Sequence, residues 1–170
     1  MERLQMISRR LQIAIFVIIV LTPAIVALDA LFGEWREVLN IPGTILIDNT
    51  RVYGVSLLLM IGVASIKPAA TMLAFWFLYK LLGYYHKGII FTEDTVTAIR
   101  KIGWALVSID VAGMFQTLVT GPLLTMFHIT PGYFSVQLQV DFLIVGIFIV
   151  LVAYVMDMGR ELQEQDSLVI

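Results

Sequence analysis

Residues 79–104 read YKLLGYYHKGIIFTEDTVTAIRKIGW, and the arrangement of the whole chain follows from this stretch. It is the longest polar interval between two segments that are apolar enough to cross a membrane. It holds four of the eleven Lys and Arg residues, namely Lys80, Lys87, Arg100 and Lys101. Because cytoplasmic loops of membrane proteins carry an excess of Lys and Arg, the stretch is predicted to connect two spans on the cytoplasmic side.

The composition indicates an integral membrane protein. Of the 170 residues, 59% are hydrophobic and 14% are charged, and the mean hydropathy is +0.92. A soluble domain averages about 25% charged residues. We therefore expect one all-α membrane domain, residues 1–170, in contact with the lipid bilayer. The lack of cysteine excludes disulfides and thiolate metal sites, and no basic stripe with interleaved aromatic residues indicates direct nucleic-acid binding.

Four transmembrane helices are predicted to form a bundle, because the chain contains four apolar runs of spanning length. The spans are about 11–31, 61–82, 102–120 and 141–157, the external loops about 32–53 and 121–140, the cytoplasmic turn about 83–101 and the cytoplasmic tail 158–170. Both the amino and the carboxyl terminus are then cytoplasmic. A signal peptide at the start is disfavoured, since the first apolar run is long and no A-x-A-like cleavage pattern follows it.

Proline, glycine and threonine mark the expected helix ends. Pro68 lies inside the second apolar segment and predicts a break or kink at Lys67-Pro68. Gly88 is a natural residue just after a helix, and Thr92 is a good N-cap for the next one. The third span is expected to end at Gly121-Pro122.

Two patterns concern packing in the second half of the chain. The sequence YFSVQLQV, residues 133–140, alternates polar and apolar residues, which predicts a short hairpin arm or an extended lead-in to the fourth span. Small residues recur every four positions at Gly113, Thr117 and Gly121, and this spacing permits close contact between helices. Small residues are also common in membrane helices that make no such contact.

Charged residues inside the apolar runs are costly and usually face a partner or a cavity. Counting along the helices places Lys67 roughly 20 Å and Asp110 roughly 14 Å from the cytoplasmic ends. A lysine side chain covers most of that difference, so the two are predicted to pair. The pair can be a structural link between two helices, which we favour, or part of an ion relay or polar pocket. Asp29 and Asp141 are the alternative partners of Lys67.

No motif for catalysis, cofactor binding or metal binding is visible. His86 and His128 are predicted on opposite sides of the membrane and therefore cannot share a metal ion. The chain contains neither H-E-x-x-H nor G-x-S-x-G, and it lacks a P-loop and G-x-G-x-x-G. A non-enzymatic protein without a cofactor is therefore expected.

Two blocks, residues 85–106 and 156–170, resemble the YoaS-like family of small bacterial membrane proteins, which is a domain of unknown function. The matching residues are Gly88, Phe91, Thr92, Arg100, Ile102, Gly103 and Trp104 in the first block, and Gly159, Leu162, Gln165, Asp166 and Leu168 in the second. The chain departs from the family pattern at Thr95 and Ser167. The resemblance covers most of residues 52–170 and implies four spans in a bacterial plasma membrane. It also implies a link to small helix-turn-helix regulators, but no reaction.

The predicted function is to present the cytoplasmic turn and tail to a protein partner in signalling or regulation. The candidate interaction surface comprises Gly88, Phe91, Thr92, Arg100, Trp104, Gly159, Glu161, Glu164 and Asp166. The acidic tail is expected to lie loosely on the helix that begins at Thr92, held by surface ion pairs with Lys87, Arg100 or Lys101. The alternative is a small transporter or channel component in which Lys67 and Asp110 line a polar path, a role that calls for a homo-oligomer.

Overall fold

The computed structural model describes residues 2–32, 35, 39, 41, 47, 48, 52–90 and 92–167, and its regular elements are all helices. They are α1 (Glu2–Phe32), α3 (Val55–Ala64), α4 (Ile66–His86), α5 (Glu93–Met126) and α6 (Asp141–Ser167). Four stretches are long and apolar enough to cross a membrane: Gln5–Leu28, Val55–His86, Glu93–Met126 and Asp141–Gln165. The predicted all-helical class with four apolar helices is confirmed. Most of the predicted loop 32–53 lies outside the described residues.

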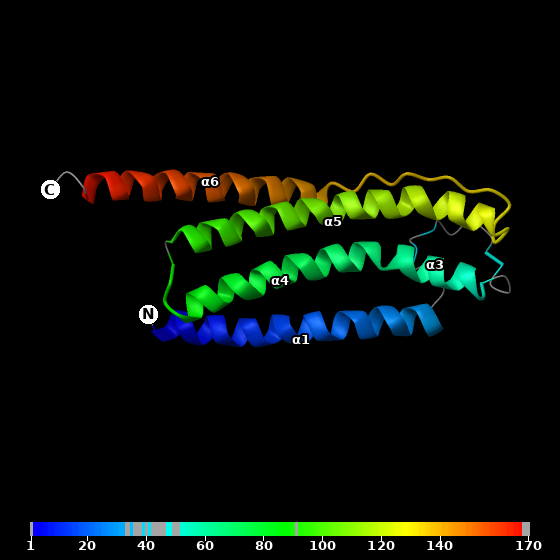
Figure 1. Cartoon of the computed structure of the whole chain (residues 1–170), viewed down its shortest axis with the longest axis horizontal. Coiled ribbons are helices and arrows are strands. Elements are labelled where there is room, and N and C mark those ends of the chain that lie inside the picture. The colour runs from blue at the N-terminus through cyan, green and yellow to red at the C-terminus, as the bar shows by residue number, and fades with distance from the viewer. Residues whose placement is uncertain are drawn as a thin grey trace.

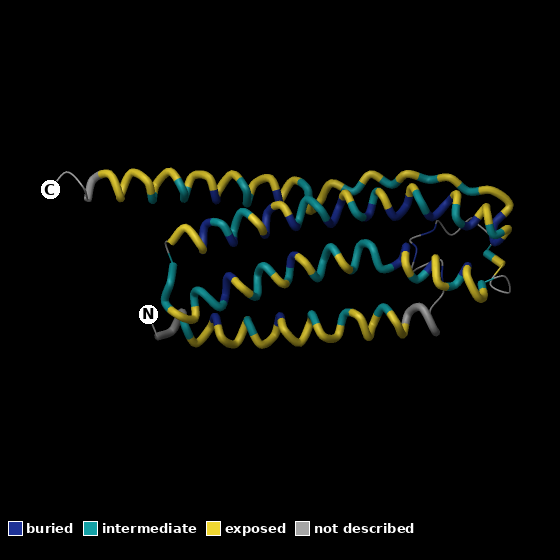
Figure 2. Tube along the Cα trace, viewed as in Figure 1, coloured by how far each residue is buried: buried dark blue, intermediate teal, exposed yellow. Residues whose placement is uncertain are grey.

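The helices lie side by side in the order α1, α4, α5, α6, with α3 continuing the line of α4 (Figure 1). The extensive contacts join neighbours in this row, α1 to α4, α4 to α5 and α5 to α6. Exposed positions run along the outer sides of α1 and α6, and buried positions concentrate on α5 and near α3 (Figure 2). The predicted bundle is therefore an open layer in the described part of the chain. Lipid can cover the apolar faces of such a layer without the penalty that water would impose.

The break in the second span lies at Ser65, just before the position that the sequence predicts. Ser65 separates α3 from α4, and its own amide donates to the carbonyl of Ile61 over 3.0 Å. Pro68 lies in the first turn of α4, where its missing amide hydrogen is best tolerated. A continuous helix would need that hydrogen to bond the carbonyl of Ala64, so the chain starts a new helix instead.

The turn between α4 and α5 forms as predicted, from local signals. Gly88 has φ +76°, its amide donates to the carbonyl of Tyr85, and the next amide, of Ile89, donates to the carbonyl of Tyr84. These two bonds form a Schellman motif, which a glycine in the left-handed region permits. Thr92 is the N-cap of α5, and its amide donates to the hydroxyl oxygen of Thr95 over 3.0 Å. Phe91 lies outside the described residues.

Helix α5 does not end at Gly121-Pro122 but continues to Met126. The extension places Leu124, which is fully buried, in a hydrophobic cluster that includes residues of α3. The cluster also contains Trp35, Leu39, Ile41, Met60, Val63, Ala64 and Ile129. Pro122 is exposed on the helix surface. The hydrophobic contacts of the last turn are the interaction that opposes the break expected from Pro122.

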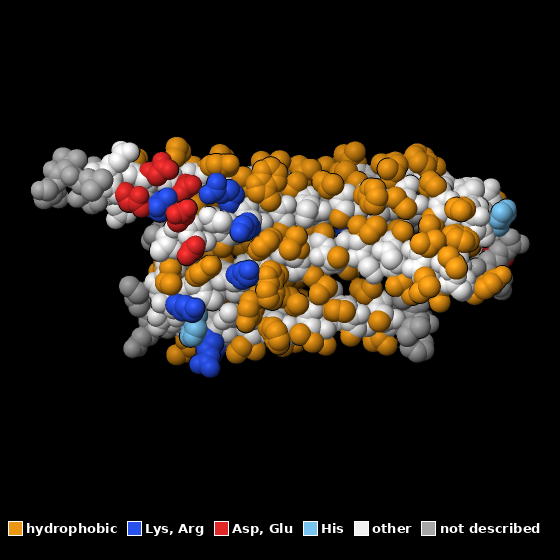
Figure 3. All heavy atoms as spheres, in the orientation of Figure 1, with side chains coloured by type: hydrophobic (Ala, Val, Ile, Leu, Met, Phe, Trp, Pro, Cys, Tyr) orange, Lys and Arg blue, Asp and Glu red, His pale blue; other side chains and the backbone are white. Residues whose placement is uncertain are grey.

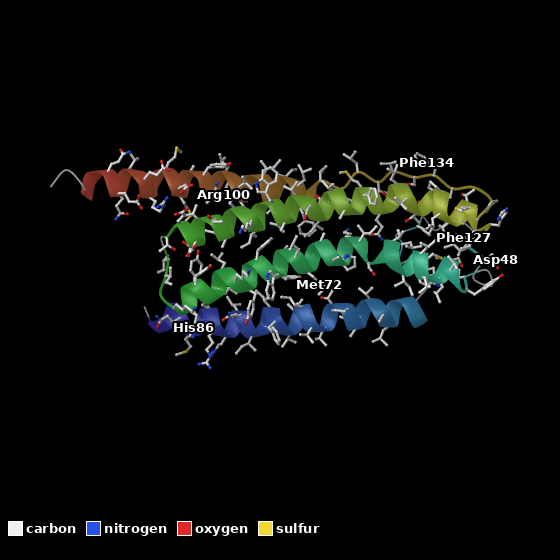
Figure 4. All side chains as sticks on the ribbon, viewed as in Figure 1. Asp48, Met72, His86, Arg100, Phe127 and Phe134 are labelled. Atoms are coloured by element: carbon white, nitrogen blue, oxygen red, sulfur yellow. The ribbon has the colours of Figure 1, made fainter. Side chains whose placement is uncertain are left out.

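Residues 132–140 form the extended lead-in to α6 and run back along α5 (Figure 1). Their apolar side chains point outward, with Phe134 69% and Leu138 77% exposed, whereas the polar residues between them are half-buried. Phe134 lies on the outer side of this segment in Figure 4. The alternation is therefore the reverse of that in a soluble protein, as expected where the outer side meets lipid and the polar side faces protein.

Helices α5 and α6 approach each other closely at two glycines. A Cβ atom added to Gly103 would come within 2.6 Å of a side-chain carbon of Val150 and 2.8 Å of the carbonyl oxygen of Gly146. One added to Gly146 would lie 2.6 Å from the carbonyl oxygen of Gly103. By contrast, Gly121 approaches the backbone of residues 133 and 134, and Gly113 approaches the side chains of Gln139 and of Lys67 in α4.

Gly146→Ala is expected to lower the free energy of unfolding by about 1–3 kcal/mol, because the added methyl group overpacks the contact with α5. Thermal unfolding of the purified protein in detergent measures the effect. Gly62→Ala is the matched control, since a Cβ there meets nothing within 4 Å and alanine favours the helix. Equal stability of the two variants would contradict the tight α5–α6 contact.

Candidate functional site

The Lys, Arg, Asp and Glu side chains gather at the end of the layer where both termini lie (Figure 3). We call the ion-paired group there, Arg100, Asp157, Arg160 and Glu164, the charged end. Asp157 accepts from Arg100 over 3.3 Å and from Arg160 over 3.4 Å. Arg160 also pairs with Glu164 at 2.7 Å, one turn further along α6. The network joins the start of α5 to the emerging end of α6.

Arg100 is held by two groups of α6 at once. Besides its ion pair with Asp157, its guanidinium lies 5.2 Å from the ring centroid of Tyr154. Such an arrangement combines an ion pair with a cation–π contact. Arg100 therefore links the start of α5 to α6. Trp104, one turn further on in α5, is 57% exposed.

The end of α6 leaves the layer as a straight helix and does not fold back on α5 (Figure 1). Glu161 is exposed, and Glu164 pairs with Arg160 of its own helix. The docking of the tail on the helix that begins at Thr92 stays a prediction. The helix of α6 is continuous to Ser167, and Gly159 lies within it with open space around its Cα. The side chain of Asp166 and residues 168–170 lie outside what the structure describes.

The structure does not pair Lys67 with Asp110. The Lys67 ammonium donates to the side-chain oxygen of Gln139 over 2.7 Å. The Asp110 carboxylate accepts the backbone amide of Leu143 over 2.7 Å. The prediction failed because depth along two helices says nothing about rotation, and each side chain faces a different neighbour. Asp29 cannot be placed as a partner, because its side chain is outside the described part.

Asp110 instead caps α6 from a neighbouring helix. It is 1% exposed, and the amide that it accepts lies in the first turn of α6. The first amides of a helix have no partner within the helix, and the positive end of the helix dipole favours a carboxylate. The buried charge is therefore stabilised without a counter-ion. Sequence reasoning found Asp110 but missed this partner, which depends on how α6 packs.

Lys67 lines a cavity of about 510 Å³ between α1, α4, α5 and the lead-in to α6. Its lining residues are Thr22, Ile25, Val26, Ala64, Lys67, Pro68, Thr71, Gly113, Gln116, Thr117 and Gln139. Gln116 is 6% exposed, and its side-chain oxygen has no hydrogen-bond partner among the described residues. Polar residues within apolar runs often mark a cavity or a functional site. Gln116 and Gln139 are such residues, so the sequence contains a signal for this cavity beyond Lys67.

The described residues contain no group of three or more His, Cys, Asp or Glu side chains that could hold a metal ion. His86 approaches the backbone carbonyl of Gln5 at 3.3 Å, at the end where the termini lie. His128 follows the last turn of α5, at the opposite end of the layer. The two histidines are therefore placed apart, as the sequence predicts.

A family model described as "Protein of unknown function (DUF2975)" matches residues 46–170. The matched region contains α3 to α6, and with them the charged end, Asp110 and Lys67. No curated protein and no solved structure matches the chain.

Asp110→Ala is expected to lower the free energy of unfolding by about 1–3 kcal/mol, because it leaves the buried amide of Leu143 without an acceptor. Asp141→Ala, at an exposed position in the first turn of α6, is the control and should cost a few tenths of a kcal/mol at most. Both are measured by thermal unfolding in detergent.

The double variant Asp110→Ala/Lys67→Met tests the predicted pair directly. Since the two side chains share no partner, their effects should add to within about 0.5 kcal/mol. A recovery of stability in the double variant would show that the two charges interact after all.

Proposed function

We propose that this chain, which belongs to the family described as a protein of unknown function (DUF2975), is a non-enzymatic multi-pass protein of the bacterial plasma membrane that presents its charged end to a cytoplasmic protein. The observation that carries the proposal is the end of α6, which extends beyond the layer as an exposed helix. The YoaS-like resemblance adds a candidate for the partner, a small helix-turn-helix regulator.

The projecting part of α6 has one side that faces away from α5. Met158, Glu161, Leu162 and Gln165 follow the spacing i, i+3, i+4, i+7, so they form one stripe along the helix. Met158 is 58% and Leu162 63% exposed. A stripe of this spacing is what a partner with a helix-binding groove engages.

The chemistry of this stripe favours a particular kind of partner. Its two apolar side chains call for an apolar groove, and the exposed carboxylate of Glu161 calls for a basic residue at the rim. The surfaces with which regulators bind DNA are rich in Lys and Arg. A regulator held on α6 through such a surface would be kept from DNA, which gives the protein a role in signalling without a reaction of its own.

The alternative function, a small transporter or channel component, has weaker support. It requires Lys67 and Asp110 to line one polar path, but Asp110 does not line the Lys67 cavity. In addition, four helices in an open layer enclose a path only after assembly into a homo-oligomer. We therefore propose that the Lys67 cavity binds a ligand and is not part of a conducting path.

A reporter of membrane topology tests the orientation that the proposal needs. Fusions at Ile170 and insertions at Gly88 should report the cytoplasm, and insertions near Gly43 or Gly132 the exterior, because Lys and Arg concentrate around the α4–α5 turn. Alkaline phosphatase and fluorescent protein fusions give opposite readouts at each site. An external signal at Gly88 would place the charged end on the wrong side and end the proposal.

Deletion of residues 161–170 should abolish co-purification of a cytoplasmic regulator from native membranes and leave the melting temperature of the protein nearly unchanged. The Arg100–Asp157 bridge remains in this variant, so the layer keeps its link between α5 and α6. Met158→Ser/Leu162→Ser should reduce co-purification at least tenfold, an effect of about 1.4 kcal/mol.

Val155→Ser is the matched control, an exposed apolar residue of α6 on the membrane side of Asp157. It should retain the partner. If the deletion unfolds the protein, the tail is structural, and if Met158→Ser/Leu162→Ser retains the partner in full, the stripe is not the binding surface.

A further inference from the structure

The Lys67 cavity contains a cation without a counter-ion. No carboxylate of the described residues forms an ion pair with Lys67, and the one hydrogen bond of its ammonium goes to the neutral amide of Gln139. An ammonium group that is half-buried at membrane depth needs an anion. An anionic group in the cavity would supply the missing counter-charge.

The cavity also contains hydrogen-bond acceptors, alongside the amide NH2 groups of Gln116 and Gln139. Thr22, Thr71 and Thr117 each donate their hydroxyl hydrogen to a carbonyl of their own helix, so they offer only oxygen lone pairs. The buried side-chain oxygen of Gln116 has no donor among the described residues. An anionic group beside Lys67 and a hydroxyl donor beside the Gln116 oxygen would satisfy both. Water could satisfy Gln116 but would leave the charge of Lys67 uncompensated.

Along α4, the backbone of Lys67 lies about 10 Å short of the far interface. Lys67 lies roughly 20 Å from Lys80 along α4, and the hydrocarbon core is about 30 Å thick. Side chains of a helix tilt toward its N-terminus, and for α4 this direction leads away from the charged end. The ammonium group is thereby carried toward the far interface, where lipid phosphates lie.

The walls of the cavity connect it to lipid. Ile25 of α1, in its rim, is 53% exposed on the outside of the layer. A second hollow of about 400 Å³ shares Thr22, Val26 and Pro68 with the first and is otherwise mostly apolar. Met72 in its wall lies on the side of α4 that faces α1 (Figure 4). A polar, cationic hollow beside an apolar one suits an amphiphile better than a free solute.

We propose that the Lys67 cavity binds the headgroup of an anionic lipid, with the phosphate at Lys67 and headgroup hydroxyl groups at Gln116. The apolar hollow beside it takes the start of an acyl chain. This site is independent of the function proposed for the charged end. Lys67 lies in the half of α4 that is remote from that end, and lipid binding requires no protein partner.

Native mass spectrometry of the delipidated full chain in detergent tests the site. Equal concentrations of dioleoylphosphatidylglycerol and dioleoylphosphatidylcholine are compared, because both contain phosphate but only the first has a net charge and hydroxyl donors. The wild type should bind one phosphatidylglycerol with a preference of about tenfold or more, the effect of one charge-assisted hydrogen bond. Equal binding of the two lipids by the wild type would overturn the proposal.

Variants assign the preference to the cavity. Lys67→Met should abolish it and Gln116→Leu should reduce it several-fold, whereas Lys67→Arg, which keeps the charge, should retain most of it. Lys80→Met removes an exposed lysine that lies 5.5 Å from the ring centroid of Trp76 and should have no effect. Size-exclusion chromatography identifies variants that fail to fold. An unchanged preference in folded Lys67→Met or folded Gln116→Leu would refute the site.

A soluble competitor distinguishes a lipid from a free anion. Glycerol 1-phosphate has the same phosphate and hydroxyl groups but no acyl chain. At millimolar concentration it should fail to displace bound phosphatidylglycerol. If it binds as tightly as the lipid, the ligand is a free organic phosphate, and the assignment to a lipid is wrong.

Discussion

The contact between Gly103 and Gly146 is the constraint on which the second half of the structure depends. Only glycine lets the backbones of α5 and α6 approach so closely, because a Cβ on either side would meet the carbonyl oxygen of the other. Two polar contacts form between the helices, one on each side of this crossing. Asp110 reaches the first turn of α6, and Arg100 reaches Asp157 near the point where α6 leaves the layer.

The lead-in at residues 132–140 shows how the chain handles irregular backbone next to lipid. An extended segment at membrane depth is tolerated where it rests on protein. Gly121 allows this segment to lie against α5, since a Cβ there would come close to the backbone of Tyr133. The apolar side chains of the segment then face lipid, and its polar side chains face protein. This segment positions Gln139 to accept a hydrogen bond from Lys67, and it ends at Val140, directly before α6.

Lys67 and Asp110 illustrate two different solutions to a charge at membrane depth. The N-terminus of α6 stabilises the carboxylate of Asp110, so this residue does not need a ligand. Among the described residues, the hydrogen-bond partner of the Lys67 ammonium is the neutral side-chain amide of Gln139. The lipid site that we propose follows from this difference. In the charged end, by contrast, Arg100 and Arg160 form ion pairs with carboxylates of α6.

The sequence by itself determined the four apolar helices, the glycine that ends α4 and the threonine that begins α5. These features rest on hydropathy over one span, or on bonds between residues a few positions apart, such as that between Thr92 and Thr95. Only the tertiary structure decided that the helices form an open layer and that Lys67 meets Gln139. The reason is rotation, since one residue turns a helix by about 100° and spacing along the chain does not say which side meets a neighbour. The same reason applies to Pro122, whose expected break is overridden by the burial of Leu124 among residues distant in sequence.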